Sequence, residues 1–460
     1  MNYLGIEFDV KNKNQVDKDY IPFYPWIREY SKKANEDFAI AVERNDGLVS
    51  VYRTKIIGTD EFFPADRRYI ERLVKFLLWA KGGFKITLCG NEKVGNSIKE
   101  DYKLNGTREF DRDFMSDVYD RDLTVSVANY ENTPAENEKA EKVGRHLNGC
   151  RIGFDAGGSD RKVSAVIEGE TVYSEEVVWF PKTTEDPDYH FNEIVTAFKT
   201  AASKMPRVDG IGISSAGIYI SNMTRRASLF LKVPKEQFDK KVRDIYIRAC
   251  KELGDIPFVV ANDGDVSALA GAMSLDSDKV MGMAMGTSEA TGYIDGNGNI
   301  AGWLNELAFA PVDLNENAMQ DEWSGDFGVG CKYFSQDAVI KLSPMAGISL
   351  DPNLSPAEKL KVVQGLMEDD DERAKSVFAS IGCYLGHTLP LYSMFYDIES
   401  LLLMGRVMSG KGGDLILSEC RRILNEEYPD LAKTLTPMLP DEKMRRVGQS
   451  VAAASLPEIR

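Results

Sequence analysis

Apolar and polar positions along the chain form short segments that predict strands and helices in turn. Residues 150–156 and 209–215 are apolar runs of strand length that end in small or glycine residues. Residues 191–205 carry apolar side chains at helical spacing, and a long helix is predicted at about 235–253. From residue 330 onward the pattern is mostly helical, broken by one strand at 400–407. Strands alternating with helices predict the α/β class.

The first 128 residues show a similar succession of elements. Residues 38–56 predict a hairpin that turns at Asn45-Asp46-Gly47, and a strand is predicted at 84–90. The helix expected at 66–80 has too many apolar positions for one exposed stripe, so we expect it to be buried. The order strand, strand, strand, helix, strand is also expected at 150–270. Residues 1–128 are therefore either a degenerate half of the same fold or a domain with a generic α/β order.

A polar, charged stretch near 130–148 separates these two regions and predicts a semi-ordered linker with a short helix. The expected organisation follows from it. It comprises an amino-terminal α/β domain at 1–128, a linker at 129–148, an amino-terminal lobe at 149–272 and a carboxyl-terminal lobe at 273–460.

Composition and charge exclude several classes of protein. Hydrophobic residues make up 43% and charged residues 28% of the 460 residues, which is typical of globular domains. The net charge of −16 argues against a nucleic-acid surface. The six cysteines are scattered, no signal-like segment opens the chain, and no apolar run is long enough to span a membrane. We therefore expect a cytoplasmic protein with no membrane or nucleic-acid partner.

Four motifs carry candidate chemistry. Bare glycine backbone after a strand, followed by a hydroxyl, can bind phosphate, and this pattern occurs twice. A carboxylate at a strand end can hold a Mg²⁺-bound water or take a proton from a hydroxyl. Each motif also has a structural interpretation, such as a hairpin turn or a helix cap. In chain order they are Asp155-Ala156-Gly157-Gly158-Ser159, Asn262-Asp263, Gly286-Thr287-Ser288 and the glycines of residues 401–413.

The order and spacing of these motifs resemble the sugar-kinase, heat-shock-ATPase and actin superfamily, and within it the ROK sugar kinases, over residues 150–455. The resemblance implies a two-lobed actin-like (ribonuclease H-like) ATPase fold with an additional amino-terminal domain. It implies ATP and Mg²⁺ as cofactors and a sugar or polyol as substrate. A homodimer is compatible with it. The roles it implies are the general base for Asp263; substrate binding for Asn262, Glu306, Ser215 and Gly217; nucleotide binding for Asp155, Gly157, Gly158, Ser159, Gly286, Thr287, Gly405 and Gly410; and a water-mediated Mg²⁺ contact for Asp155.

This chain departs from the ROK pattern at the family's zinc centre. The family's Glu-x-Gly-His segment corresponds to residues 306–309, where Glu306 is kept but Phe309 takes the histidine position. The family's cysteine-rich loop keeps Cys331 alone, with Ser324 and Asp326 at the other two cysteine positions. One thiolate cannot make a tetrahedral structural site, so we expect no zinc.

Three functions fit these observations. The first is ATP-dependent phosphorylation of a sugar or sugar-like hydroxyl, with Asp263 as base. The second is a non-enzymatic sugar-binding sensor or regulator, and the third is a pseudokinase with an altered pocket. An assay of phosphoryl transfer over a panel of sugars separates them.

Overall fold

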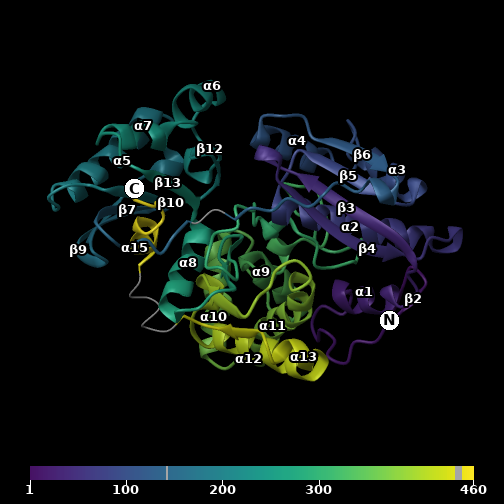
Figure 1. Ribbon diagram of the computed structural model, residues 1–460. Helices are drawn as coiled ribbons and strands as arrows, with labels where there is room; N and C mark the ends of the chain where they lie inside the picture. Colours follow the sequence, from purple (N-terminus) through teal and green to yellow (C-terminus); the bar gives the residue numbers. More distant parts are fainter. Residues whose placement is uncertain (141–142, 441–447, 460) are drawn as a thin grey trace. The chain divides into compact units, whose positions relative to one another are not determined.

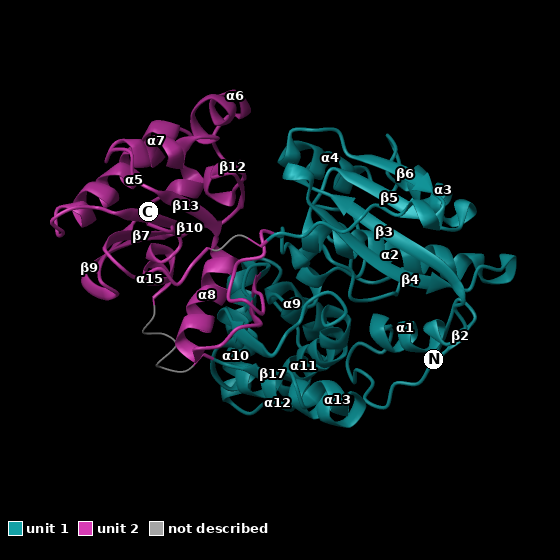
Figure 2. Cartoon of the chain, in the orientation of Figure 1, with its two compact units in different colours: residues 1–139, 283–291, 303–439 teal, residues 140–282, 292–302, 440–460 magenta. Residues whose placement is uncertain are grey.

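A computed structural model describes residues 1–140, 143–440 and 448–459, and the chain is of mixed α/β type. It divides into two compact units (Figure 2). Unit 1 comprises residues 1–139, 283–291 and 303–439, and unit 2 comprises residues 140–282, 292–302 and 440–460. No helix among the described residues is long and apolar enough to cross a membrane.

Unit 2 is built around a five-stranded sheet in the order β13-β10-β7-β8-β9 (Figure 1). β7 pairs antiparallel with β8 and parallel with β10, and β10 pairs parallel with β13. The carboxyl ends of β7, β10 and β13 therefore lie at one edge of the sheet. The elements are β7 (Cys150–Ala156), β8 (Asp160–Ile167), β9 (Glu170–Val178), α5 (Pro187–Ala202), β10 (Gly210–Ser215), β11 (Ile218–Ile220), β12 (Met223–Arg226), α6 (Lys235–Gln237), α7 (Ile245–Lys251), β13 (Phe258–Asn262), α8 (Asp263–Leu275) and α15 (Gln449–Ala454).

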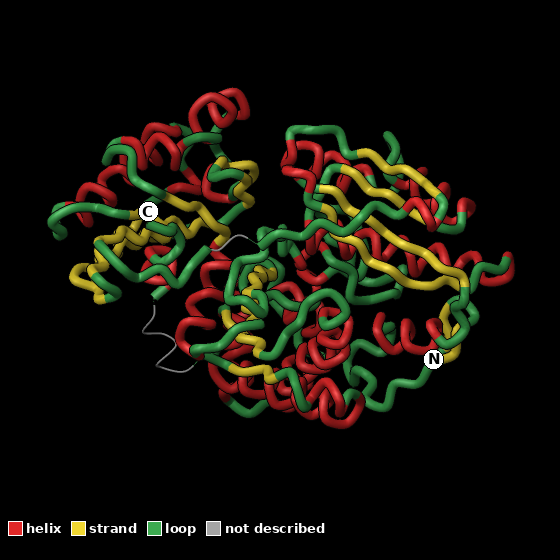
Figure 3. The backbone as a smooth tube through the Cα atoms, viewed as in Figure 1, coloured by secondary structure: helices red, strands yellow, loops and turns green. Residues whose placement is uncertain are grey.

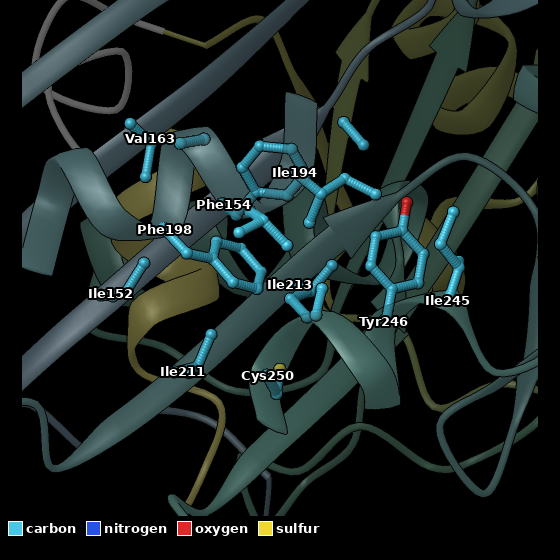
Figure 4. Close-up of a cluster of buried hydrophobic side chains, with 14 of the residues drawn as sticks. Ile152, Phe154, Val163, Ile194, Phe198, Ile211, Ile213, Ile245, Tyr246 and Cys250 are labelled. Carbon is cyan, nitrogen blue, oxygen red and sulfur yellow. The ribbon is translucent and has the colours of Figure 1, made fainter. Parts of the chain in front are cut away.

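The core of unit 2 consists of apolar side chains from the sheet and from α5 and α7, among them Phe154, Phe198 and Ile213 (Figure 4). The helix α15 packs directly on β7 and β10, and two glycines in these strands make this possible. A Cβ on Gly153 or Gly212 would lie 1.6 Å from the carbonyl oxygen of Ser450 or Ala453. The strand glycines are therefore required by the close approach of a helix backbone.

The long helix expected at 235–253 does not form as one element. A π-helical turn, Phe238–Val242, follows α6, and α7 begins after it. The carbonyl of Arg243 accepts a hydrogen bond from the amide of Thr224, which draws it out of the helical ladder. Tertiary contact with β12 overrides the helical pattern here.

Unit 1 contains a four-stranded sheet in the order β4-β3-β5-β6, whose strands lie side by side in Figure 3. A second sheet has the order β15-β14-β16-β17, and its strands β14 and β15 each run from one unit's residues into the other's. The elements are β1 (Asn2–Tyr3), β2 (Ile6–Glu7), α1 (Phe23–Ser31), β3 (Glu36–Glu43), β4 (Val49–Ile56), α2 (Phe63–Lys81), β5 (Lys85–Cys89), α3 (Glu92–Asp101), α4 (Glu109–Tyr119), β6 (Thr124–Ala128), β14 (Val280–Met285), β15 (Glu289–Ile294), α9 (Gln336–Met345), α10 (Pro356–Glu368), α11 (Glu372–Tyr392), β16 (Ser400–Met404), α12 (Gly410–Glu427), α13 (Pro429–Ala432) and β17 (Thr436–Met438).

The hairpin and the buried helix expected in the first 128 residues are both present. The hairpin of β3 and β4 turns at Asn45–Gly47. All residues of α2 from Tyr69 to Lys81 are buried, including its charged ones. Residues 1–139 share a compact unit with residues 303–439, so α2 has neighbours from far along the sequence.

The strand that would begin the expected repeat in residues 1–128 does not join the main sheet of that region. The first apolar segment forms only the two-residue strands β1 and β2, which pair with each other and not with the main sheet. β3 pairs antiparallel with β5, whereas β7 pairs parallel with β10. The strands β8 and β10 of unit 2 also run antiparallel to each other, on either side of β7, so the interpretation of residues 1–128 as a degenerate half of the same fold stays a prediction.

The stretch expected to be a linker begins as ordered chain packed on unit 1. It has a 3-10 turn at Tyr130–Asn132, and Asn137 pairs with Val49 of β4. Residues 141–142 of the expected linker lie outside the described residues.

Candidate functional site

Polar side chains gather where β7, β10 and β13 end. The register aligns Asp155 with Ser214, and Ser215 with both Ala156 and Asn262. Asp263 follows β13 directly as the first residue of α8. In an open α/β sheet, ligands bind at the carboxyl ends of parallel strands. The residues predicted as base and Mg²⁺ contact thus lie at one sheet edge.

Asp155 is a buried carboxylate held by a serine that the sequence analysis did not single out. The Ser214 hydroxyl donates to Asp155 Oδ1 over 2.8 Å, and the Gln449 side chain donates to Ser214 Oγ over 3.1 Å. Burial raises the pKa of Asp155 to about 6, and the charge of Asp263 adds to the rise. A cation placed here would relieve this repulsion, because hard divalent ions bind to one or two carboxylates together with phosphate oxygens.

Asn262 and Asp263 begin α8, as the structural interpretation of this motif also predicted. The Asn262 side chain accepts from the Gly264 amide over 2.7 Å, which caps the helix. Its amide nitrogen donates to the Gly217 carbonyl over 2.7 Å, so it also fixes the loop after β10. Only one of its amide protons is used in this way.

The Asp263 carboxylate is set in an environment suited to proton transfer. Burial raises its pKa, while the Gly264 amide and the charge of Lys182 act in the opposite direction. Gln449 donates to the backbone carbonyl of Asp263 over 2.9 Å, which anchors this residue to α15. A carboxylate that is desolvated but still supported by a cation can accept a proton from a bound hydroxyl.

Ser215 differs from its neighbours because its hydroxyl is buried between two tyrosines. It lies 2.7 Å from the Tyr246 hydroxyl and accepts from the Tyr219 hydroxyl over 2.6 Å. Successive side chains of a strand point to opposite faces, so Ser214 faces Asp155 while Ser215 faces these rings. This arrangement favours packing as the role of the Ser215 side chain.

The turn after β7 carries the predicted phosphate-binding residues Gly157, Gly158 and Ser159. Neither glycine has a positive φ, so the backbone conformation of the turn does not itself require glycine. Close neighbours face both glycines: a fixed backbone atom at Gly157 and the end of the exposed Lys182 side chain at Gly158. A Cβ on Gly157 would lie 2.7 Å from the Asp160 carbonyl, and one on Gly158 would lie 2.6 Å from Lys182 Cε.

The remaining predicted nucleotide-binding residues lie in unit 1. Gly286 begins the turn between β14 and β15, and its carbonyl accepts from the Gln336 amide over 2.9 Å. Thr287 is exposed at the tip of this turn. Gly405 has a φ of 93° and its Cβ would lie 2.4 Å from the Met285 carbonyl, so the ends of β16 and β14 meet there. Gly410 is the first residue of α12.

The segment that carries Glu306 is attached to the carboxyl end of α2. The amides of Leu304, Asn305 and Glu306 donate to the last carbonyls of this helix, those of Lys81, Ala80 and Trp79, over 3.3, 3.0 and 3.1 Å. These carbonyls have no partner within the helix, so the segment completes the helix end. The Tyr396 hydroxyl donates to Asn305 Oδ1 over 3.0 Å.

The positions that correspond to the family's zinc centre have other partners in this chain. Phe309 packs on Trp79 with ring centroids 4.3 Å apart, and Cys331 donates weakly to Asp321 over 3.6 Å. Asp326 pairs with Arg72, Lys75 and Arg108 at 3.0, 3.2 and 2.9 Å, all of them buried. In the described part of the chain, no three His, Cys, Asp or Glu side chains are grouped so as to hold a metal.

Glu289 is a further buried carboxylate in unit 1 that the sequence analysis missed. It begins β15 directly after the Gly286–Ser288 turn. Tyr392 donates to its Oε1 over 3.2 Å, and its Oε2 has no hydrogen-bond partner in the described structure. Burial raises its pKa to about 8, and the charge of Glu306 acts in the same direction.

The structure thus forms two groups of predicted site residues, one in each unit. Unit 2 holds the proposed base, the Mg²⁺ contact and the first phosphate turn. Unit 1 holds the second phosphate turn, the adenosine-side glycines and Glu306. The residues of these two groups were predicted from the sequence, and their functional roles stay predictions. Lys182, Ser214 and Glu289 were not predicted as site residues, because each lies outside the four motifs.

Comparison with solved structures identifies the fold. The ROK hexokinase from Thermus thermophilus matches with a TM-score of 0.52 at 16% sequence identity, over 66% of this chain and 97% of that one. Over the matched residues the chain has the fold of this ROK hexokinase. A ROK-family transcriptional regulator, a homologue of the E. coli Mlc protein, matches with a TM-score of 0.50 at 16% identity, over 67% of this chain and 79% of that one. No protein-family model and no curated protein matches the sequence.

The ROK resemblance expected from the motifs is therefore confirmed for the fold. The hexokinase is matched over nearly its whole length, so the part of this chain outside the match is additional to that protein. Because the ROK matches include both an enzyme and a regulator, the fold alone does not assign an activity.

Proposed function

We propose that this protein is an ATP-dependent kinase that phosphorylates a hydroxyl of a sugar or polyol. The observation that carries the proposal is the position of Asp263. Its carboxylate follows β13, within electrostatic reach of Asp155, and its pKa is raised by burial. A general base for a hydroxyl and a metal-binding carboxylate are needed side by side in phosphoryl transfer.

In the proposed reaction the acceptor hydroxyl oxygen attacks the γ-phosphorus of ATP. The bond between that phosphorus and the bridging oxygen of ADP breaks, and the hydroxyl proton passes to the Asp263 carboxylate. Asn262 binds another hydroxyl of the acceptor and holds it in line for attack. The ROK resemblance implies an acceptor-binding role for Glu306 of unit 1 as well. The Gly157–Ser159 turn binds phosphate through backbone amides.

Asp155 would hold Mg²⁺, which when bound neutralises charge on the phosphate oxygens. The fit rests on the Asp155 carboxylate, whose pKa is raised to about 6 by burial and by Asp263. A nearby cation stabilises the ionised form of such a carboxylate. Mg²⁺ often keeps several waters and takes few protein ligands, so this sparse donor set is suitable.

A sugar-binding regulator without phosphoryl transfer is the second candidate. It is supported by the fold match to a ROK regulator and by the departure from the family pattern at Phe309. The two candidates differ in a simple assay. The purified protein is incubated with ATP, Mg²⁺ and a panel of hexoses, amino sugars and polyols, and ADP release is followed by a coupled enzyme assay.

Sugar-dependent ADP release with a phosphorylated sugar in the product mixture would support the kinase. Calorimetric binding of a sugar with no ADP release at any sugar concentration would support the regulator. If the protein neither releases ADP in the presence of a sugar nor binds a sugar, the result counts against both the kinase and the regulator.

A further inference from the structure

A short segment in unit 2, residues 179–184, crosses the glycine turn that follows β7. We call it the 179–184 strap. The Trp179 indole nitrogen donates to the Gly157 carbonyl over 2.7 Å, and the Trp179 amide donates to the Ser159 carbonyl over 3.2 Å. The strap is therefore hydrogen-bonded to both sides of the turn.

The strap is also held in place by His190 of α5. His190 is completely buried, and its ring nitrogens lie 3.0 Å from the Pro181 carbonyl and 3.1 Å from the Asp186 carbonyl. The Thr184 hydroxyl donates to the Phe180 carbonyl over 2.6 Å, which closes the strap on itself. Lys182 stands between these anchored positions, so its backbone is held in place while its side chain is exposed.

The Lys182 side chain lies over the glycine turn. A Cβ on Gly158 would be 2.6 Å from Lys182 Cε and 2.7 Å from Nζ. The lysine is also close enough to Asp263 for its charge to act on that carboxylate. The ammonium thus lies beside the predicted phosphate turn and within electrostatic reach of the proposed base.

Lys182 differs from the other lysine of this region in its partners. Lys162 Nζ lies 3.7 Å from Asp160 and 3.8 Å from Glu176, so its charge is already paired. In the described parts of the chain, no carboxylate is in ion-pair contact with the Lys182 ammonium. Its charge is therefore available to an anion.

We propose that Lys182 is a phosphate-binding residue of this site and contacts the terminal phosphate of the nucleotide; this rests on the proposed kinase function. A phosphate brought to the Gly157–Ser159 turn meets two carboxylates, Asp155 and Asp263, which repel it. Backbone amides alone supply no net charge to offset this repulsion. A lysine ammonium does so as a compact point charge with three donors.

The same placement gives Lys182 a second effect. It favours the ionised form of Asp263, which is the form that accepts a proton. Removal of the lysine should therefore weaken phosphate binding and shift the pH dependence of transfer together. A residue that served only the packing of the strap would not produce this combination.

The test compares Lys182→Met with Lys199→Met, a control in which an exposed lysine of α5, bonded to Glu252 over 3.5 Å, is replaced in the same way. Calorimetry measures binding of ATP and of inorganic tripolyphosphate. We expect Lys182→Met to bind both about ten- to a hundred-fold more weakly, since a lost charge-assisted hydrogen bond has this effect. Lys199→Met should bind like the unsubstituted protein, and Lys182→Arg should recover part of the affinity.

With a sugar that serves as acceptor, the acidic limb of the pH profile of kcat/KM should move to higher pH in Lys182→Met. Unchanged binding of both anions, together with an unchanged pH profile, would overturn the proposal. Circular dichroism checks the fold of each variant, and Lys182→Gln replaces Lys182→Met if the latter does not fold. Lysine-dependent tripolyphosphate binding without phosphoryl transfer to any sugar would support this phosphate site and count against the kinase function.

Discussion

The backbone amide of Glu306 donates to the carbonyl of Trp79 over 3.1 Å. Glu306, which we propose binds the sugar, is thereby attached to the last turn of α2, a helix from the first 81 residues of the chain. Tyr396 contacts the adjacent Asn305. The first part of unit 1 thus fixes the backbone position of Glu306.

The first prediction concerns this attachment. Tyr396→Phe removes the hydroxyl that donates to Asn305 and leaves the ring in place. We expect KM for the acceptor to rise about five- to ten-fold, the effect of one lost hydrogen bond, while KM for ATP stays the same. Steady-state kinetics with each substrate varied in turn measures both. An equal rise in the two constants would point to a general disturbance and not to the acceptor.

The second prediction tests the base. Asp263→Asn keeps the shape of the side chain and a group that can accept from the Gly264 amide, but it cannot take up the acceptor proton. We expect phosphoryl transfer to fall by about a hundred-fold or more, while ATP affinity stays within a few-fold. Coupled kinetics and calorimetry measure the two quantities. Turnover near that of the unsubstituted protein would show that another group is the base.

The third prediction tests the glycine turn. In Gly158→Val the new side chain would meet Lys182 at 2.6 Å and displace it from the turn. We expect ATP binding to weaken by at least ten-fold, because both the bare backbone and the lysine are lost to phosphate. Gly365→Val is the matched control, since a Cβ there meets no atom within 4 Å. If both folded variants bind ATP equally well, the turn does not contact phosphate.

The fourth prediction follows from the raised pKa of Glu289, about 8 in the folded protein against an ordinary value of 4.5. The folded state holds this proton more tightly than the unfolded state does. The stability contribution is therefore fully present below about pH 4.5 and is lost as the pH rises to 8. Glu289→Gln is uncharged at every pH, and its side-chain carbonyl can still accept from Tyr392.

Thermal melting followed by circular dichroism at pH 5, 7 and 9 tests this. The midpoint of Glu289→Gln relative to the unsubstituted protein should rise steadily across this series. A constant difference would mean that Glu289 titrates near its ordinary value.

The fifth prediction is that the purified protein holds no zinc. Asp326 is paired with three buried cations, and Phe309 is packed in an aromatic cluster, so neither is placed as a metal ligand. Elemental analysis after gel filtration measures the metal content. One zinc per chain would require Cys331 to have ligands that neither the motif nor the structure indicates.

Much of the unit 2 site could be predicted because its signals are local. A buried apolar strand followed at once by Asp155 or by Asn262-Asp263 marks a strand end, and parallel strands bring such ends together. Lys182 could not be found in this way. It lies in an exposed loop with no motif, and only the folding of the strap over the turn brings it to Gly158.

Strand direction and long-range pairing were the parts of the fold that the sequence pattern could not specify. The period of apolar residues is the same in parallel and antiparallel strands, so the pairing of β3 with β5 was not predictable from it. The buried charges of α2, Arg72 and Lys75, have their partner Asp326 some 250 residues later. A pattern read within one segment contains no information on such contacts.

The close packing of α15 on the strand glycines Gly153 and Gly212 has a consequence for biosynthesis. The sheet of unit 2 starts to emerge from the ribosome at residue 150, but the helix that covers β7 and β10 is made only after residue 448. Until then the glycine-lined face of the sheet stays uncovered, and Gln449 is not available to Ser214 or Asp263. The proposed catalytic carboxylates therefore reach their final environment only after α15 has been synthesised, long after the strands of the sheet that it covers.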